Sequence, residues 1–319
     1  MKSKIKKLVP LSAKRFLYRQ YTETAPIVLS RILNIVGYNV SRSTNFYSPL
    51  PSVSELKATR NRWDKPSQLN GLKYDVESMK TLLSSLLRSH VDEYLGLPDY
   101  QELHSKGFGL GYTPTDSLTL FLMIRHLKPK RYIEVGSGLS TYYCHLAAEL
   151  NRSEGFPLEM ICIEPYPLKN LLTLPDIEVI QSPVQDIEPS LFRKLQSGDM
   201  LFIDSSHVVR IDGDVPYLFL EILPTLSKGV NIHIHDIPFP YNSPFPSERW
   251  VFGVAEPMFW TEAMLLQAFL AHNDDFEILL SLPIIRHFDE GFLRSVVPKY
   301  KGIDEDSNAF SSIFLRRVS

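Results

Sequence analysis

Two aspartates and a histidine follow short apolar segments of this chain. Asp204 ends the segment MLFID, Asp236 ends VNIHIHD, and His207 follows Asp204 by three residues. Paired carboxylates can bind Mg²⁺, and such an ion lowers the pKa of a hydroxyl group that it holds. A histidine near its ordinary pKa accepts a proton close to neutral pH. These residue types predict the activation of a hydroxyl nucleophile, with His207 as general base.

A metal ion at the two carboxylates would need further ligands. Ile237 follows Asp236 directly and has no donor atom in its side chain. His207 and His235 are the alternatives for a third ligand, and the sequence leaves metal-bound and metal-free centres equally open. His233 shares a strand face with His235, and we interpret it as a buried structural group.

Alternating strands and helices must position these residues. Apolar runs predict strands over 131–135, 159–163, 177–180, 200–203 and 230–235, with helices over 139–151, 188–195 and 215–226 between them. A helix that opens at Asp116 precedes the first strand, and another follows Trp260. Two last strands, near 276–282 and 309–316, would form an antiparallel hairpin at the edge. The prediction is an α/β fold, a Rossmann-like doubly wound seven-stranded sheet, mostly parallel with one antiparallel edge strand.

The domain prediction divides the chain at residue 105. Residues 1–105 read as an accessory, mainly helical N-terminal extension, and 106–319 as the catalytic domain. Its loop 237–262 is rich in proline and unusually long, which is typical of a substrate lid. Packing of the loop itself is the alternative role for each of its residues. The predicted substrate contacts in this loop are Tyr241, Arg249, Trp250, Trp260 and Glu262.

A glycine turn follows the first strand, in the order E-V-G-S-G-L-S-T. Gly136 and Gly138 allow a sharp turn, but Thr141 stands where a dinucleotide fingerprint has its third glycine. Glu164, after the second strand, occupies the place from which an acid binds ribose hydroxyls. The turn alone is compatible with a nicotinamide cofactor, with S-adenosylmethionine, or with simple chain reversal.

The ordered series of motifs is more specific than the turn. E-V-G-S-G, Glu164, V-Q-D-I, GDMLFIDSSH and GVNIHIHDI cover about residues 106–282. Together they resemble a class I S-adenosylmethionine-dependent methyltransferase of the catechol and macrocin O-methyltransferase group, and H-x-H-D-I-x-x-P resembles a signature of its bacterial members. The resemblance implies O-methylation of a small hydroxylated molecule, a sugar or a glycosylated natural product. The implied cofactor is S-adenosyl-L-methionine, with Mg²⁺ as an option.

The resemblance also assigns residues. In catechol-type members a lysine that acts as base holds the position of His207, and the two acids bind metal. Tyr112, Thr113 and Asp116 either close over the cofactor or form the helix entry. The implied cofactor-binding residues are Glu134, Gly136, Ser137, Gly138, Glu164, Gln185, Asp186 and Asp204.

Composition limits the partners. The formal net charge of −2 over 319 residues argues against a nucleic-acid-binding protein. The sequence contains no apolar run of about 18 residues, so it predicts no transmembrane segment. Cys144 and Cys162 lie in apolar segments, which indicates free thiols in a reducing compartment and hence the cytoplasm. We predict that the basic N-terminal segment is a solvated tail, and weak contact with an anionic membrane is the alternative. Its basic residues are Lys2, Lys4, Lys6, Lys7, Lys14, Arg15 and Arg19.

Two other functions are compatible with these observations. A nicotinamide-dependent oxidoreductase would use the acid at Glu164, but it does not explain Thr141 or the paired aspartates. A non-catalytic scaffold that binds S-adenosylmethionine would use residues 1–105 to hold a partner. The sequence leaves the oligomeric state open.

Overall fold

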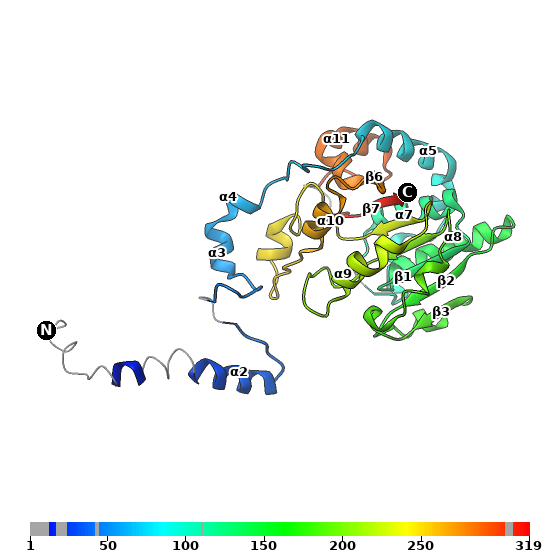
Figure 1. Cartoon of the computed structure of the whole chain (residues 1–319). Coiled ribbons are helices and arrows are strands. Elements are labelled where there is room, and N and C mark those ends of the chain that lie inside the picture. The colour runs from blue at the N-terminus through cyan, green and yellow to red at the C-terminus, as the bar shows by residue number, and fades with distance from the viewer. Residues whose placement is uncertain (1–12, 17–23, 42–44, 110, 304–308) are drawn as a thin grey trace. The chain divides into compact units, whose positions relative to one another are not determined.

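The computed structural model describes residues 13–16, 24–41, 45–109, 111–303 and 309–319 (Figure 1). The chain divides into two compact units, one up to Arg60 and one from Asn61 onward. The first contains α2 (Ala25–Ile35) and α3 (Val53–Ala58), and α4 (Arg60–Trp63) spans the division. Much of the basic N-terminus lies outside the described residues. Among the described residues, no helix has both the length and the apolar character to cross a bilayer.

The second unit is built on one seven-stranded sheet, in the order β3-β2-β1-β4-β5-β7-β6. All neighbours are parallel except β7, which is antiparallel to both β5 and β6. The predicted Rossmann-like, mostly parallel sheet is confirmed. The strands are β1 (Arg131–Val135), β2 (Glu159–Ile163), β3 (Ile177–Ile180), β4 (Met200–Ile203), β5 (Asn231–Ile234), β6 (Phe276–Ser281) and β7 (Ile313–Arg317).

Helices pack around this sheet. In the second unit α5, α7 and α8 contact one another in series, and α5 also contacts α11 and β6. Figure 1 shows α5 and α11 side by side beyond β6. The α-helices are α5 (Val76–Leu95), α6 (Tyr100–Ser105), α7 (Pro114–Leu127), α8 (Leu139–Ser153), α9 (Asp214–Tyr217), α10 (Glu262–Leu270) and α11 (Leu282–Val296). Short 3₁₀ and π turns are η3 (Leu171–Thr173), η4 (Val184–Asp186), η5 (Phe192–Lys194), η6 (Leu218–Ile222), η7 (Leu223–Thr225) and η8 (Glu248–Phe252).

Three connections differ from the sequence prediction, and one of them is the helix predicted over 215–226, which is observed as α9 followed by the short turns η6 and η7. The last two strands pair antiparallel as expected, but α11 lies between them, so they do not form a tight hairpin. Ser281 begins α11 by accepting a hydrogen bond from the Ile284 N–H, and Pro283 lies in its first turn. The helix predicted over 188–195 is reduced to η5, because one turn already buries Phe192 and Leu195.

The glycine turn follows β1 and packs against the end of β4. Gly136 has a φ of +80°, and a Cβ added there would lie 1.8 Å from the carbonyl oxygen of Asp204. A Cβ on Gly138 would lie 2.7 Å from the carbonyl oxygen of Phe108. The Asp204 N–H also donates to the carbonyl of Val135 at 2.8 Å. Both glycines are therefore required because the chain packs on its own backbone at this turn.

Glu134 lies beneath the turn, fully buried in β1. It accepts a hydrogen bond from the Ser140 hydroxyl of α8, and its other oxygen lies 3.8 Å from the Cys162 sulfur of β2. Burial raises the pKa of the Glu134 carboxyl to about 8, although Ser140 and Thr141 act to lower it. The carboxyl is therefore protonated near neutral pH.

Gly136→Ala should strongly destabilise the protein. The new methyl group would overlap the Asp204 carbonyl oxygen, and we expect a loss of about 4 kcal/mol or more in the free energy of unfolding, measured in urea. Gly155→Ala is the matched control, since Gly155 has a φ of +88° but open space around its Cβ position. It should cost only about 1 kcal/mol. Equal costs at both positions would show that backbone strain, and not the contact with Asp204, explains the glycine.

Glu134→Gln should change how stability depends on pH. The folded pKa of about 8 lies above the usual 4.5, so the protonated carboxyl stabilises fully below about pH 4.5. That contribution is lost as the pH rises to 8, at up to about 1.4 kcal/mol per pH unit. Between pH 5 and 8.5, the free energy of unfolding of the variant should therefore rise relative to that of the native protein as the pH rises. Glu178→Gln, at an exposed position on β3, is the control, and parallel curves for all three proteins would contradict the prediction.

Candidate active site

Two cavities open at the carboxyl ends of the parallel strands. The first, of about 250 Å³, is lined by Phe108, Gly109, Tyr112, Gly136, Ser137, Gly138, Leu139, Ser140, Glu164, Leu168 and Asp204. The second, of about 630 Å³, is lined by residues of α6, of the segment before α7, of the strand ends and of the loop before α10. Asp204 and Tyr112 line both cavities, so the two adjoin at these residues.

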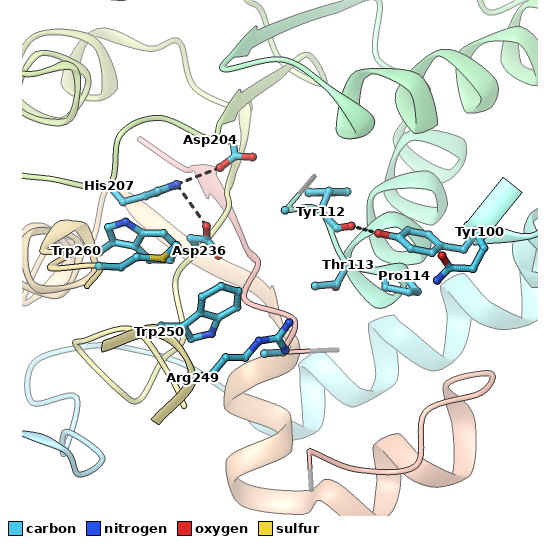
Figure 2. A pocket seen from close by; sticks show the side chains of 14 residues that line it. Tyr100, Tyr112, Thr113, Pro114, Asp204, His207, Asp236, Arg249, Trp250 and Trp260 are labelled. Atoms are coloured by element: carbon cyan, nitrogen blue, oxygen red, sulfur yellow. Dashed lines mark hydrogen bonds and ion pairs between the residues drawn. The ribbon is translucent and has the colours of Figure 1, made fainter. Parts of the chain in front are cut away.

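Figure 2 shows the second cavity from close by. His207 points between Asp204 and Asp236, with Trp250 and Trp260 on the same side. Tyr100, Tyr112, Thr113 and Pro114 face them. One side of the cavity thus carries the carboxylates, the imidazole and two indole rings, and the facing side carries two tyrosines with Thr113 and Pro114.

His207 is the centre of the polar side. Its Nε2 atom lies 3.2 Å from Asp204 Oδ1 and 3.4 Å from Asp236 Oδ2. Its Nδ1 atom lies 2.8 Å from Oε2 of Glu262, the first residue of α10. The Trp260 ring packs on the imidazole at 4.8 Å between ring centres. Both imidazole nitrogens therefore face carboxylates, and the ring is held in place from one face.

A second histidine extends the polar cluster. His235 Nδ1 lies 3.3 Å from Asp204 Oδ1, and its Nε2 lies 3.4 Å from Asp116 Oδ2. Asp116 was expected to cap its helix, but the Thr113 hydroxyl caps α7 by accepting from the Asp116 N–H. The Asp116 carboxylate turns instead toward His235. The Ser311 hydroxyl, just before β7, donates to Asp236 Oδ1 at 2.8 Å.

These contacts shift the pKa values of both histidines. Burial acts to lower the pKa of His207, but the facing carboxylates of Asp204, Glu262 and Asp236 raise it well above the ordinary value. The same opposition raises the pKa of His235. The premise of an unperturbed histidine base is therefore wrong, because His207 holds a proton near neutral pH as long as these carboxylates face it.

The pKa values of the carboxylates shift in different directions. Burial acts to raise the pKa of Asp204, yet His235 and His207 hold it well below its usual range. Asp116 is likewise kept ionised by His235 despite its burial. At Glu262 burial prevails and raises the pKa even though His207 acts to lower it. Because the pKa values of His207 and Glu262 are both raised, we expect the two groups to share one proton in the hydrogen bond between His207 Nδ1 and Glu262 Oε2.

Asp204, His207 and Asp236 also have the geometry of a metal centre. One ligand atom from each lies within 4.8 Å of the others. Two carboxylate oxygens and one imidazole nitrogen are donors that divalent cations accept. Of the two histidines expected as alternatives for the third ligand, His207 is the one in this cluster, while Ile237 is fully buried in the core.

The predicted cofactor residues divide into two groups. Gly136, Ser137, Gly138, Glu164 and Asp204 line the first cavity together. Glu134 lies below the turn and does not line it. Gln185 and Asp186, in η4, do not line it either. Gln185 donates to the carbonyl of Asp212, and Asp186 is exposed.

The predicted substrate contacts divide in the same way. Arg249, Trp250 and Trp260 line the second cavity, with the Arg249 guanidinium 4.5 Å above the Trp250 ring. Tyr241 does not line it and stacks on Phe245 at 3.8 Å. Glu262 is 1% exposed, contacts His207 and does not line the second cavity.

Several lining residues were missed from the sequence. Tyr100, Gln101 and Met258 line the second cavity, and Phe108 and Gly109 line the first. Ser311 was also missed, although a signal for it existed. The last predicted strand was expected to run antiparallel, and the start of such a strand lies at the carboxyl ends of the parallel strands.

Several solved structures are similar to this chain. An O-methyltransferase of Bacillus cereus in complex with SAH is 12% identical with a TM-score of 0.42, over 77% of this chain and 100% of its own. The O-methyltransferase TomG of Streptomyces achromogenes, involved in tomaymycin synthesis and solved with SAM, is 16% identical with a TM-score of 0.40, over 78% and 92%. A CmcI structure with Mg and SAM is 15% identical with a TM-score of 0.34, over 65% and 73%.

Two sequence matches show the family. A family model described as a methyltransferase domain matches residues 133–237, from β1 to the residue after Asp236. An uncharacterized protein of Archaeoglobus fulgidus is 30% identical over 168 residues, which are 48% of this chain and 73% of the archaeal protein. The matched domain contains the glycine turn, Glu164 and the Asp204–His207–Asp236 centre. The chain belongs to the class I S-adenosylmethionine-dependent methyltransferases.

Proposed function

We propose that this methyltransferase transfers a methyl group to a hydroxyl oxygen of a small molecule. One observation carries the proposal: Asp204 and Tyr112 line both cavities, with the carboxylate and imidazole centre at the junction. A donor in the first cavity and an acceptor in the second would meet beside groups that bind protons and cations. The family assignment leaves no support for the nicotinamide alternative.

The first cavity has groups that fit the cofactor. The Glu164 carboxylate lines it and accepts from the N–H groups of Ser137 and Tyr166, at 3.3 and 2.8 Å. These bonds orient the carboxylate and leave it acceptor capacity for ribose hydroxyls. The Ser137 hydroxyl is buried without a hydrogen-bond partner among the described residues, which suits a polar ligand in the cavity. S-adenosylmethionine, when bound, supplies a methyl group on a positively charged sulfur.

The polar centre would activate the acceptor. Asp204, His207 and Asp236 all line the second cavity, so an acceptor hydroxyl there lies within reach of their side chains. Because His207 already holds a proton, we assign proton acceptance to the centre as a whole rather than to a free imidazole. A divalent cation there, Mg²⁺ by the sequence-based expectation, would lower the hydroxyl pKa.

The loop residues suit a ring-shaped acceptor. Trp250 and Trp260 stack with their ring centres 6.3 Å apart, and both line the second cavity. Arg249 covers Trp250 and adds hydrogen-bond donors for hydroxyl or carboxylate groups. Flat aromatic surfaces with one nearby donor favour a sugar ring or an aromatic ring. Of these two ring types, the sequence resemblance favours the sugar, so a sugar or a glycosylated natural product is our proposed acceptor class.

The cysteines support a reducing environment for this reaction. Cys144 and Cys162 are both buried and free, and burial raises the pKa of both thiols. Such thiols are inert packing groups and need no oxidising compartment. We propose that the enzyme acts in the cytoplasm.

Binding of S-adenosylhomocysteine tests the cofactor cavity. We expect micromolar binding by calorimetry, and Glu164→Gln should weaken it about 10- to 100-fold because hydrogen bonds to the carboxylate are lost. Glu178→Gln, exposed on the neighbouring strand β3, should bind as the native protein does. Absence of binding by the native protein would contradict the proposed function.

Asp236→Asn should separate turnover from cofactor binding. Asp236 lines only the second cavity, whereas Asp204 lines both. We expect an unchanged affinity for S-adenosylhomocysteine and a fall in kcat of about 10²-fold or more. Methyl transfer would be measured on a panel of sugars, glycosylated natural products and catechols, with the methylated atom identified by mass spectrometry. Methylation of nitrogen or carbon, or an active Asp236→Asn variant, would overturn the assignment.

A further inference from the structure

The contact between Glu262 and His207 determines which histidine nitrogen faces the two aspartates. Glu262 is 1% exposed and His207 is 6% exposed, and 2.8 Å separates Oε2 from Nδ1. A carboxylate accepts only, so Nδ1 is the N–H donor in this pair. The Nε2 atom is then the one directed toward Asp204 and Asp236, and an ion bound there would displace the proton that Nε2 holds in the absence of metal. A carboxylate behind a histidine in this way is typical of metal ligands.

The distances around Nε2 are in the range expected for donor atoms that share a metal ion. Nε2 lies 3.2 Å from Asp204 and 3.4 Å from Asp236. Charge-assisted hydrogen bonds between N–H and carboxylate are shorter, about 2.7–2.9 Å. Donor atoms placed about 2.1 Å from a tetrahedral or octahedral ion stand about 3.0–3.4 Å apart. The two separations therefore match the edges of a coordination polyhedron.

The charge of the cluster also favours a divalent cation. Four carboxylates, those of Asp116, Asp204, Asp236 and Glu262, contact the imidazoles of His207 and His235. With all six groups ionised, four negative and two positive charges leave a formal charge of −2. Glu262 Oε1 is buried and has no hydrogen-bond partner among the described residues. A cation between the aspartates would balance this excess.

The donor set distinguishes between cations. Mg²⁺ prefers an octahedron of oxygen atoms and takes nitrogen ligands poorly. Zn²⁺ and Co²⁺ bind imidazole nitrogen together with carboxylate oxygen. The residue after Asp236 is Ile237, fully buried, so this position adds no oxygen ligand. His207 is therefore the side chain placed to act as a third protein ligand, and all three residues line the second cavity, from which further ligands would come.

We propose that Asp204, His207 and Asp236 form a transition-metal site that selects Zn²⁺- or Co²⁺-type ions over Mg²⁺. Glu262 is its positioning residue and directs His207 Nε2 at the ion. The role of the ion in methyl transfer rests on the proposed function. Its binding does not, and it can be measured without cofactor or acceptor.

Metal titration of the untagged full-length protein tests the selectivity. After treatment with EDTA and its removal, the protein is titrated with CoCl₂, ZnCl₂ and MgCl₂ by calorimetry. We expect one Co²⁺ per chain, bound at least tenfold more tightly than Mg²⁺, with a visible absorption band. Co²⁺ should also quench tryptophan fluorescence, since Trp260 packs on His207. Equal or tighter Mg²⁺ binding, or no Co²⁺ binding, would overturn the proposal.

Variants test the role of Glu262. Glu262→Gln should weaken Co²⁺ binding about 10- to 100-fold and leave S-adenosylhomocysteine binding unchanged. Glu256→Gln, exposed in the same loop, is the matched control and should bind Co²⁺ normally. Full Co²⁺ affinity in Glu262→Gln would remove Glu262 from the site. His207→Asp supplies a third oxygen ligand, so the Co²⁺ preference over Mg²⁺ should fall at least tenfold, and an unchanged preference would contradict the ligand assignment.

The two proposals fail in different ways. Tight Co²⁺ binding without methyl transfer to any acceptor would leave the metal site standing and remove the proposed O-methylation. Methyl transfer that is unaffected by EDTA, in a protein that binds none of the three ions, would remove the metal site and leave the proposed O-methylation standing. If Glu262→Gln does not fold by circular dichroism, competition between Co²⁺ and Mg²⁺ on the native protein decides the proposal.

Discussion

The contact between Gly136 and the carbonyl of Asp204 is the constraint on which the site depends. It leaves no space for a side chain at Gly136, so the turn after β1 lies directly against the end of β4. The Val135 carbonyl accepts a hydrogen bond from Asp204 at the same place. Because of this close approach, the Asp204 side chain lines both cavities. A wider separation of the two strands at this point would move the first cavity away from the polar centre.

The polar centre is one continuous chain of acids and histidines. It runs from Asp116 to His235, then to Asp204, His207 and Glu262. These residues come from α7, from the ends of β5 and β4, and from α10, so the cluster links elements far apart in sequence. Buried charges are costly unless each has a partner, and here each acid meets a histidine. The cluster therefore ties the arrangement of these elements to one protonation pattern.

The sequence predicted the sheet well but the site only in part. The strand predictions for β1 to β4 agree with the structure residue for residue, because each is a short, mainly apolar run followed by a glycine or a polar residue. Asp204, His207 and Asp236 could be brought together from topology alone, since all three follow neighbouring strands. The expected and observed placements differ where a side chain's orientation depends on tertiary packing.

Glu262 is the clearest case of that difference. Its position in the long loop indicated contact with a substrate, but the loop folds so that it supports His207 from behind. Asp116 likewise has the residue type of a helix cap, and only the location of His235 shows why it does not act as one. Gln185 and Asp186 follow the expected strand and lie in the η4 turn, yet neither lines the first cavity. No local pattern reports these orientations.

The placement of β7 has a consequence for how this enzyme is synthesised. Residues 235–312 separate β5 from β7, its antiparallel neighbour. At ribosomal rates of about 5–20 residues per second, β5 waits on the order of ten seconds for that neighbour. During this time the edge formed by the apolar residues Ile232 and Ile234 lacks its partner strand, and such edges are prone to intermolecular pairing. Ser311, the partner of Asp236, also emerges late, so the nascent chain completes its sheet and its site in one step.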